Sequence, residues 1–205
     1  MLGRSHARAP GMTGETFLPE PGFTFLHPND RARWHMAGQG DITPVVDSIV
    51  ETHGGTGMLW YGEEFEDFIL RLQFRMFSME DNSGVYVRFP DDALHAREPD
   101  WERGLEIQID DRGYDPEARI FGSPLHLTGA VYKRAPATRL ASMPVGQWNA
   151  LEVAARGEVV RVTLNGEEVS FYRTPPELPR RGHVGLQNHH EGSRVQFRWV
   201  RIQPL

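Results

Sequence analysis

Apolar and polar side chains alternate with a period of two in segment after segment of this 205-residue chain. Such segments include 68–74, 151–153, 160–164 and 195–199. This period places the apolar side chains on one face of a β-strand. Turn signals separate the segments, and Asn165-Gly166 is a dipeptide that favours a two-residue hairpin turn. Because long helical periodicity is missing, the sequence predicts an all-β sandwich or barrel.

The last of these segments contains a break in the alternation. The inward parity shifts between Trp199 and Val200, since Val200 and Ile202 continue the apolar series. An extra residue in one strand changes which face the following side chains take. We therefore expect a β-bulge at Trp199 and Val200.

The segment 105–111 carries an unusually reactive polar face. Glu106, Gln108 and Asp110 share one face of the expected strand, and the two isoleucines between them share the other. Carboxylates and carboxamides bind sugar hydroxyls or move protons, whereas ordinary wet faces carry Thr, Ser or Lys. This strand alone does not distinguish such a site from an ordinary solvent-exposed face of an antiparallel sheet.

Two further expected strands have similar polar faces. In 83–89, Tyr86 and Arg88 share the polar face. In 183–189, the outward residues are His183, Gln187 and His189. If the three strands lie side by side in one sheet, their polar faces line a groove with an acid, a base and a cation. Such a groove is a candidate site by default.

Two long connections flank this expected groove. They span 90–104 and 112–128, and both exceed the usual length of a connection. Long loops beside a polar face are commonly functional. We expect them to form the walls of the groove.

Composition excludes several classes of protein. The chain has no cysteine, which rules out disulfides, thiolate catalysis and sulfur-ligated metals. A net charge of −6 without long charged blocks argues against a nucleic-acid partner. No apolar run approaches the roughly 20 residues that cross a bilayer, so no membrane partner is expected. Residues 1–21 have no apolar core typical of a signal peptide, so we expect a flexible arm, one domain over 22–205 and a cytoplasmic location.

An ordered series of blocks resembles a known family. The blocks are Asp67-Phe68, Asn82–Arg88, Glu106–Asp110, Thr128–Tyr132, Gly146–Asn149, Leu164–Gly166, Gly185–His189 and Val195–Arg198. The series is similar to the 3-keto-disaccharide hydrolase domain family, within the concanavalin A-like lectin and glucanase superfamily. The resemblance covers about 23–205. It implies a jelly-roll β-sandwich of two curved antiparallel sheets, with a carbohydrate groove on the concave face.

The same resemblance implies a chemistry and carries some departures. Relatives act on glycosides oxidised at C3, by hydrolysis or by elimination followed by hydration, and many are exported. His190 stands where the family usually has Gly, and Trp199 where Asn is frequent. The loop after Asp110 is longer than in typical members. These departures leave the choice of substrate open.

The spacing of the carboxylates disfavours a direct retaining glycosidase. Glu106 and Asp110 lie four residues apart, which is roughly 13 Å on a regular strand. A retaining pair requires about 5 Å. A ketone at C3 instead acidifies the C2 proton, so one base is sufficient, with an acid at the glycosidic oxygen and a cation or donors that stabilise the enolate.

The sequence therefore yields a set of candidate residues. The catalytic candidates are Glu106 or His189 as base and Asp110 as a donor. The substrate-binding candidates are Arg88 as enolate stabiliser, Tyr86, Gln108, Gln187, Tyr132 and His53. The expected partner is a small-molecule carbohydrate.

Other interpretations stay open at this point. The same face could belong to a non-catalytic, lectin-like binding domain, because the fold alone does not confer chemistry. An interaction module that uses the exposed loops is a third class. Arg88 could also pair with Glu106 across the sheet in a purely structural role. We expect no cofactor and no metal; the less favoured alternative is calcium held by Asp110, Asp111 and Asp115.

Overall fold

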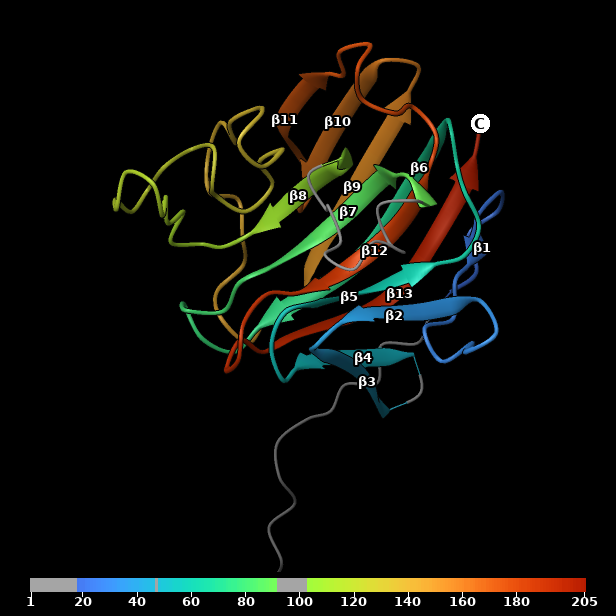
Figure 1. Cartoon of the computed structure of the whole chain (residues 1–205), viewed down its shortest axis with the longest axis horizontal. Coiled ribbons are helices and arrows are strands. Elements are labelled where there is room, and N and C mark those ends of the chain that lie inside the picture. The colour runs from blue at the N-terminus through green and yellow to red at the C-terminus, as the bar shows by residue number, and fades with distance from the viewer. Residues whose placement is uncertain (1–17, 47, 92–102) are drawn as a thin grey trace, which may run out of the picture.

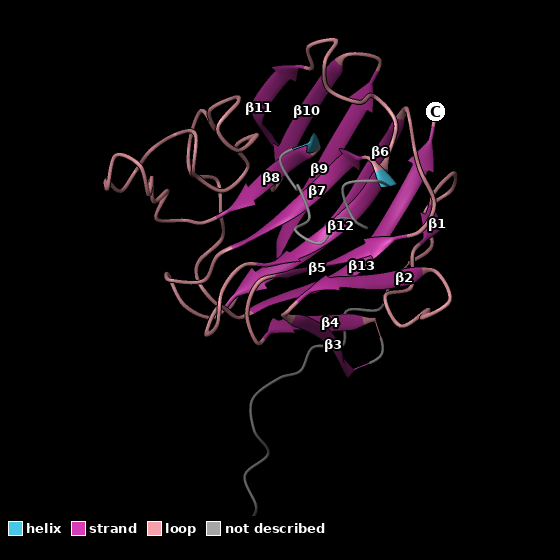
Figure 2. Ribbon diagram, in the orientation of Figure 1, coloured by secondary structure: helices cyan, strands magenta, loops and turns pink. Residues whose placement is uncertain are grey.

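The computed structural model describes residues 18–46, 48–91 and 103–205. In this part of the chain thirteen strands form two antiparallel sheets (Figures 1 and 2). The predicted all-β sandwich is therefore confirmed. Most of the predicted N-terminal arm, up to residue 17, lies outside the described residues. Among the described residues, no helix has the length and apolar character needed to cross a membrane.

The larger sheet has eight strands. Its order is β11 (Glu167–Arg173), β10 (Val159–Leu164), β9 (Asn149–Arg156), β6 (Phe68–Met76), β13 (Val195–Pro204), β4 (Ile49–His53) and β3 (Asp41–Val46), with the short β1 (Thr24–Phe25) also paired to β13. The β10–β11 hairpin turns at Asn165 and Gly166, as the sequence predicts, and Asn165 takes a positive φ of 52° there. Both residues of a two-residue hairpin turn of this type need positive φ, which Asn and Gly adopt at low cost.

The smaller sheet has five strands and carries the polar faces singled out above. Its order is β2 (Trp34–Gly38), β5 (Gly57–Tyr61), β12 (His183–Asn188), β7 (Ser83–Phe89) and β8 (Leu105–Ile109). The three polar strands β12, β7 and β8 are therefore direct neighbours, as expected.

The apolar faces of the two sheets meet in one core. Val85, Ile107 and Leu186 come from the smaller sheet, and Phe74 and Phe197 from the larger one, and all five are buried. Burying an apolar side chain of this size stabilises the fold by about 1.5–3 kcal/mol. Since the core takes the apolar face of β7, β8 and β12, their polar face is directed away from the larger sheet.

A bulge interrupts β13 where the sequence predicts one. Its pairing with β6 shifts register between Arg198 and Arg201, and Trp199 has a φ of 57°. The extra residue turns Trp199 outward, where the Arg198 guanidinium lies 3.7 Å from its ring centroid. Val200 and Ile202 thereby keep their places in the core.

A second bulge, in β7, was not predicted. His183 pairs with Phe89 and Val184 pairs with Val87, so Arg88 is the extra residue, with a φ of 55°. A bulge of this kind reverses the faces of the residues that follow. Phe89, which the alternation places in the core between the sheets, instead packs with Tyr86 in a separate apolar cluster.

Candidate functional site

A pocket of about 330 Å³ lies on the polar face of the five-stranded sheet. Its described lining consists of Tyr86, Gly104, Glu106, Gln108, Tyr132, Lys133, Arg134, Gln187 and His189. The volume is at the lower end of the range for small-molecule sites. The predicted candidates Glu106, His189, Tyr86, Gln108, Gln187 and Tyr132 thus lie together, on three neighbouring strands and one loop.

A directed hydrogen-bond relay crosses the floor of the pocket. Tyr86 Oη donates to Glu106 Oε2 at 2.8 Å, and Gln187 Nε2 donates to Tyr86 Oη at 3.3 Å. The direction follows from chemistry, because an ionised carboxylate only accepts. The Tyr86 hydroxyl is therefore the hydrogen-bond donor to Glu106. The Gln187 amide directs its NH₂ group toward Tyr86 and donates to its oxygen.

The second oxygen of Glu106 is held as well. The Gln108 amide satisfies its neighbours when its NH₂ group donates to Glu106 Oε1 at 3.1 Å and to the Ser83 carbonyl at 3.2 Å. Gly84 of β7, which pairs with Gln108, leaves space for this carboxylate, since a Cβ there would collide with Oε1. Two donors thus fix Glu106, which is 9% exposed, in the geometry of a carboxylate acceptor.

His189 contributes the second titratable group of the pocket. It follows the last residue of β12, and its backbone carbonyl accepts a 2.9 Å hydrogen bond from Thr56 Oγ1. His189 is an exposed residue, but protein atoms around the ring still lower the pKa of the imidazole by desolvation, and the adjacent His190 lowers it further; Asp110 opposes this effect. Since an ordinary His titrates near 6.5, the His189 ring is neutral at pH 7 and can accept a proton.

The loop after Tyr132 forms another wall of the pocket and carries two cations that the sequence did not predict as site residues. Lys133 and Arg134 follow Tyr132, and the Tyr132 amide donates to the Glu106 carbonyl at 2.9 Å, which fastens this wall to β8. Lys133 Nζ also donates to Glu117 Oε1 at 2.7 Å. One signal pointed to this wall, because Lys133 is the single lysine of the chain and directly follows one of the family blocks.

Arg88 does not lie in the pocket, which corrects the prediction that it stabilises an enolate there. The β7 bulge turns its side chain to the opposite face, where it is 0% exposed. Its guanidinium donates to the carbonyls of Glu66 and Gly157 at 2.6–2.9 Å and to Asp67 Oδ1 at 3.1 Å. Arg88 therefore fastens the smaller sheet to turns of the larger one, and its expected pairing with Glu106 is also wrong.

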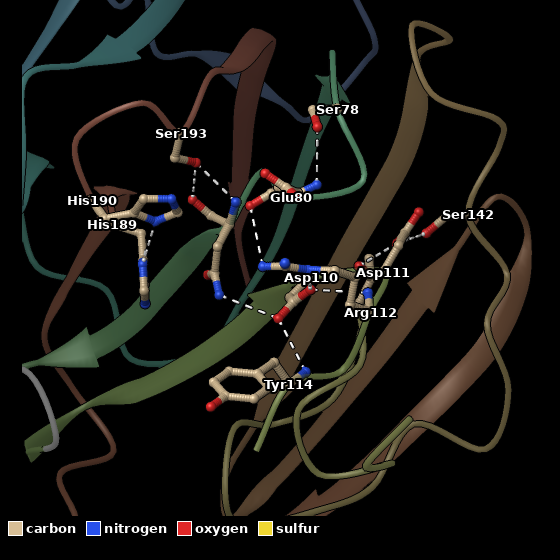
Figure 3. A network of polar contacts seen from close by, with 12 residues as sticks. Ser78, Glu80, Asp110, Asp111, Arg112, Tyr114, Ser142, His189, His190 and Ser193 are labelled. Atoms are coloured by element: carbon tan, nitrogen blue, oxygen red, sulfur yellow. Dashed lines mark hydrogen bonds and ion pairs between the residues drawn. The ribbon is translucent and has the colours of Figure 1, made fainter. Parts of the chain in front are cut away.

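Asp110 lies on the predicted face but is used by the following loop. Oδ1 accepts from the Arg112 amide at 2.9 Å and Oδ2 from the Tyr114 amide at 3.2 Å, with Asn82 at 3.4 Å (Figure 3). The carboxylate is 0% exposed and does not line the pocket. The predicted role of proton donor to a substrate does not fit a carboxylate held by two backbone amides.

His53 is also placed elsewhere. It ends β4 in the larger sheet, and its exposed ring lies 3.0 Å from Thr43 Oγ1 on the neighbouring strand β3. Its ring does not line the pocket. The prediction failed because nothing in the sequence indicates to which sheet the strand before Gly54 belongs.

The structure tests one of the two loops that were expected to wall the groove. Most of the first loop, at 92–102, lies outside the described residues, and its end at Gly104 lines the pocket. No residue of 112–128 lines the pocket. That loop instead supports the wall from behind, because the His126 ring meets Tyr132 edge-on with centroids 4.9 Å apart.

The carboxylates proposed as an alternative calcium site do not converge. Asp111 Oδ1 accepts from Thr128 at 2.6 Å and from Ser142 at 2.7 Å, and Asp115 caps the amides of residues 117 and 118. The described part of the chain holds no group of three or more His, Asp or Glu residues that could bind a metal ion.

The fold and the pocket agree with what the comparisons with known proteins show, which is a carbohydrate-related, glycosyl hydrolase-like or carbohydrate-binding class of protein. The chain belongs to the 3-keto-alpha-glucoside-1,2-lyase-like domain family, whose model matches residues 28–203. The family that the sequence blocks suggest is therefore confirmed. No curated protein matches this sequence.

Solved structures with the same fold include two candidate glycosyl hydrolases from Parabacteroides distasonis ATCC 8503. One is 25% identical with a TM-score of 0.71 and covers 89% of this chain and 99% of its own. The other is 19% identical with a TM-score of 0.74, covering 90% and 94%. The carbohydrate binding module CBM66 from Bacillus subtilis is 13% identical with a TM-score of 0.59, covering 83% and 94%, and shares the fold alone.

Proposed function

We propose that this protein cleaves glycosides oxidised at C3 of the sugar, by eliminating the group at C1 and then adding water. The proposal depends mainly on one observation. Among the described residues that line the pocket, Glu106 is the one carboxylate. Ordinary glycosidases use two carboxylates across the scissile bond. Elimination beside a ketone requires a single base at C2.

In the first step Glu106 takes the C2 proton. The electron pair of the C–H bond passes into the enolate, whose oxygen is at C3, and then forms the C1–C2 double bond as the C1–oxygen bond breaks. Lys133 and Arg134 offset the charge on the enolate oxygen. We assign Tyr132, on the same wall, as the donor that protonates the departing oxygen.

In the second step water adds to the unsaturated ketone. Neutral His189 takes one proton of the water while the water oxygen bonds to C1. Glu106, whose carboxyl proton exchanges with solvent while the unsaturated ketone is bound, then protonates C2. The proton on His189 then restores the Tyr132 hydroxyl. The two steps together amount to hydrolysis of the glycoside. Glu106 transfers protons at C2, and His189 accepts the proton of the attacking water.

A second candidate function is sugar binding without turnover. One observation favours it: both oxygens of Glu106 already accept hydrogen bonds from the protein, through Tyr86 and Gln108. A carboxylate fixed in this way also suits a rigid acceptor for sugar hydroxyls.

Incubation with a 3-keto disaccharide in D₂O tests the proposal. We expect release of free sugar, transient ultraviolet absorption from the unsaturated ketone, and deuterium at C2 of the product. Release without deuterium at C2 would indicate direct hydrolysis and contradict the elimination. Binding without release would favour the second candidate function.

Matched substitutions assign the base. Glu106→Gln keeps the size of the side chain and removes the proton acceptor, so turnover should fall by about 10²- to 10⁴-fold. Glu168→Gln is the control, because Glu168 lies on the exposed β10–β11 hairpin, paired with Arg161. Full activity in Glu106→Gln would exclude Glu106 as the base.

A further inference from the structure

The ring of His189 is held by the ring of the next residue. The Nδ1 atoms of His189 and His190 lie 2.9 Å apart, and the two ring planes are perpendicular, at 90° (Figure 3). Two ring nitrogens at this distance share one hydrogen, since a neutral imidazole carries its proton on one nitrogen. If both carried a hydrogen the two N–H groups would oppose each other.

The backbone fixes the two histidines on both sides. Thr56 Oγ1 donates to the carbonyl of His189 at 2.9 Å, and the Ser193 amide donates to the carbonyl of His190 at 3.2 Å. Ser193 in turn exchanges hydrogen bonds with the backbone of Asn82 on the entry to β7. The pair is therefore built into the end of the five-stranded sheet.

We propose that His190 is a positioning residue that makes His189 the general base of the pocket. His190 Nδ1 accepts the Nδ1 hydrogen of His189, so Nε2 of His189 carries a lone pair. The His189 part of this proposal rests on the proposed function, whereas the tautomer does not. In catalytic triads a carboxylate accepts the Nδ1 hydrogen of the catalytic histidine and so sets its tautomer. Here the neutral His190 ring takes the role of that carboxylate.

Two neighbouring side chains act on the protonation of His189. Asp110, at the end of β8, acts on the ring and favours its protonated form, whereas His190 disfavours it. Within the pocket the ring shares the lining with Glu106 of β8 and with the cations Lys133 and Arg134 of the loop after Tyr132. Because His190 takes Nδ1, Nε2 is the ring nitrogen of His189 left to act in this pocket.

The chemical consequence is a defined proton path. When water attacks C1, one of its protons moves to His189 Nε2, and its electron pair forms the new C1–oxygen bond. The imidazolium keeps its Nδ1 hydrogen bond to His190, so the ring does not turn away. Two protonated rings would repel each other at the shared Nδ1 contact.

Nitrogen NMR of the full chain, labelled at histidine, measures the tautomer directly. The His189 signals are assigned from their absence in His189→Gln. In the wild type we expect Nδ1 protonated and Nε2 unprotonated at neutral pH. In His190→Ala the tautomers should mix and the pKa of His189 should shift, whereas in His190→Asn the Oδ1 atom can accept the same hydrogen and the tautomer should persist.

Kinetics with a 3-keto disaccharide supplies the second readout. His190→Ala should lose about 10-fold in kcat/KM, and the acid limb of its pH profile should shift with the pKa of His189. His190→Asn should recover most of the rate. The proposal is overturned if wild-type His189 carries its proton on Nε2, or if His190→Ala leaves both the tautomer and the pH profile unchanged. If no variant turns over the sugar, the proposed function fails, and the NMR result still decides the role of His190.

Discussion

Tyr86 and Glu106 stand directly opposite each other on β7 and β8, and the phenol donates to the carboxylate at 2.8 Å. Directly opposed residues on one sheet face have neighbouring Cβ atoms, so this contact follows from register. Gln187, on the other side of β7, completes the relay. Glu106 is thereby positioned by two strands besides its own.

Replacing Tyr86 tests this positioning. Tyr86→Phe keeps the ring and removes the hydroxyl, so Glu106 loses one of its two donors and Gln187 loses its acceptor. We expect turnover to fall about 10-fold and stability by about 0.5–1.5 kcal/mol, the net value of a hydrogen bond. Steady-state kinetics and urea unfolding measure the two effects. Unchanged kinetics would show that Glu106 needs no donor from β7.

Arg88 should matter for stability rather than for binding. Arg88→Met removes a fully buried cation that joins the sheets through Glu66, Gly157 and Asp67. Loss of one partner from such a buried charged network costs about 3–5 kcal/mol. Equilibrium denaturation should show this loss, while the sugar affinity of the remaining folded protein should match the wild type. A loss of sugar affinity with normal stability would contradict this prediction and indicate that Arg88 takes part in sugar binding.

The cationic wall should lower the barrier rather than only hold the sugar. Lys133→Met keeps the side-chain length and removes the charge, so kcat should fall by about 10²-fold if the amine stabilises the enolate. Arg161→Met on the exposed β10–β11 hairpin is the matched control. A rise in KM at constant kcat would instead assign Lys133 to ground-state binding.

Asp111 should make stability depend on pH. Burial raises the pKa of its carboxyl above the ordinary value, although Thr128 and Ser142 oppose this with hydrogen bonds. The pKa of Asp111 is therefore higher in the folded protein than in the unfolded chain. As pH rises from the unfolded pKa through the folded pKa, ionisation of this carboxyl lowers the stability of the folded state. Asp111→Asn keeps the Oδ1 acceptor without the charge.

The expected result for Asp111→Asn is a gain on the order of 1 kcal/mol at neutral pH and none below the unfolded pKa, near 4. Melting temperatures of the variant and the wild type between pH 3 and pH 7 measure this difference. Turnover should not change, because Asp111 does not line the pocket. A variant that is less stable than the wild type at neutral pH would contradict the prediction.

The sequence by itself determined the fold class and the floor of the site. Period-two alternation assigned Ile107 and Val85 to the core and Glu106 and Tyr86 to the opposite face, because a strand directs successive side chains to opposite sides. The bulge in β13 was also readable, since Val200 and Ile202 restart an apolar series that the break at Trp199 interrupts.

Tertiary structure decided what alternation cannot encode. The bulge at Arg88 leaves no mark in the pattern, because the residue after it, Phe89, is apolar and finds an apolar cluster on the other face. The wall of Lys133 and Arg134 comes from a loop, whose position depends on distant contacts rather than on a local period. Spacing along a strand determines the face that a side chain takes, whereas partners such as Tyr86 and Gln187 around Glu106 depend on how distant strands pair.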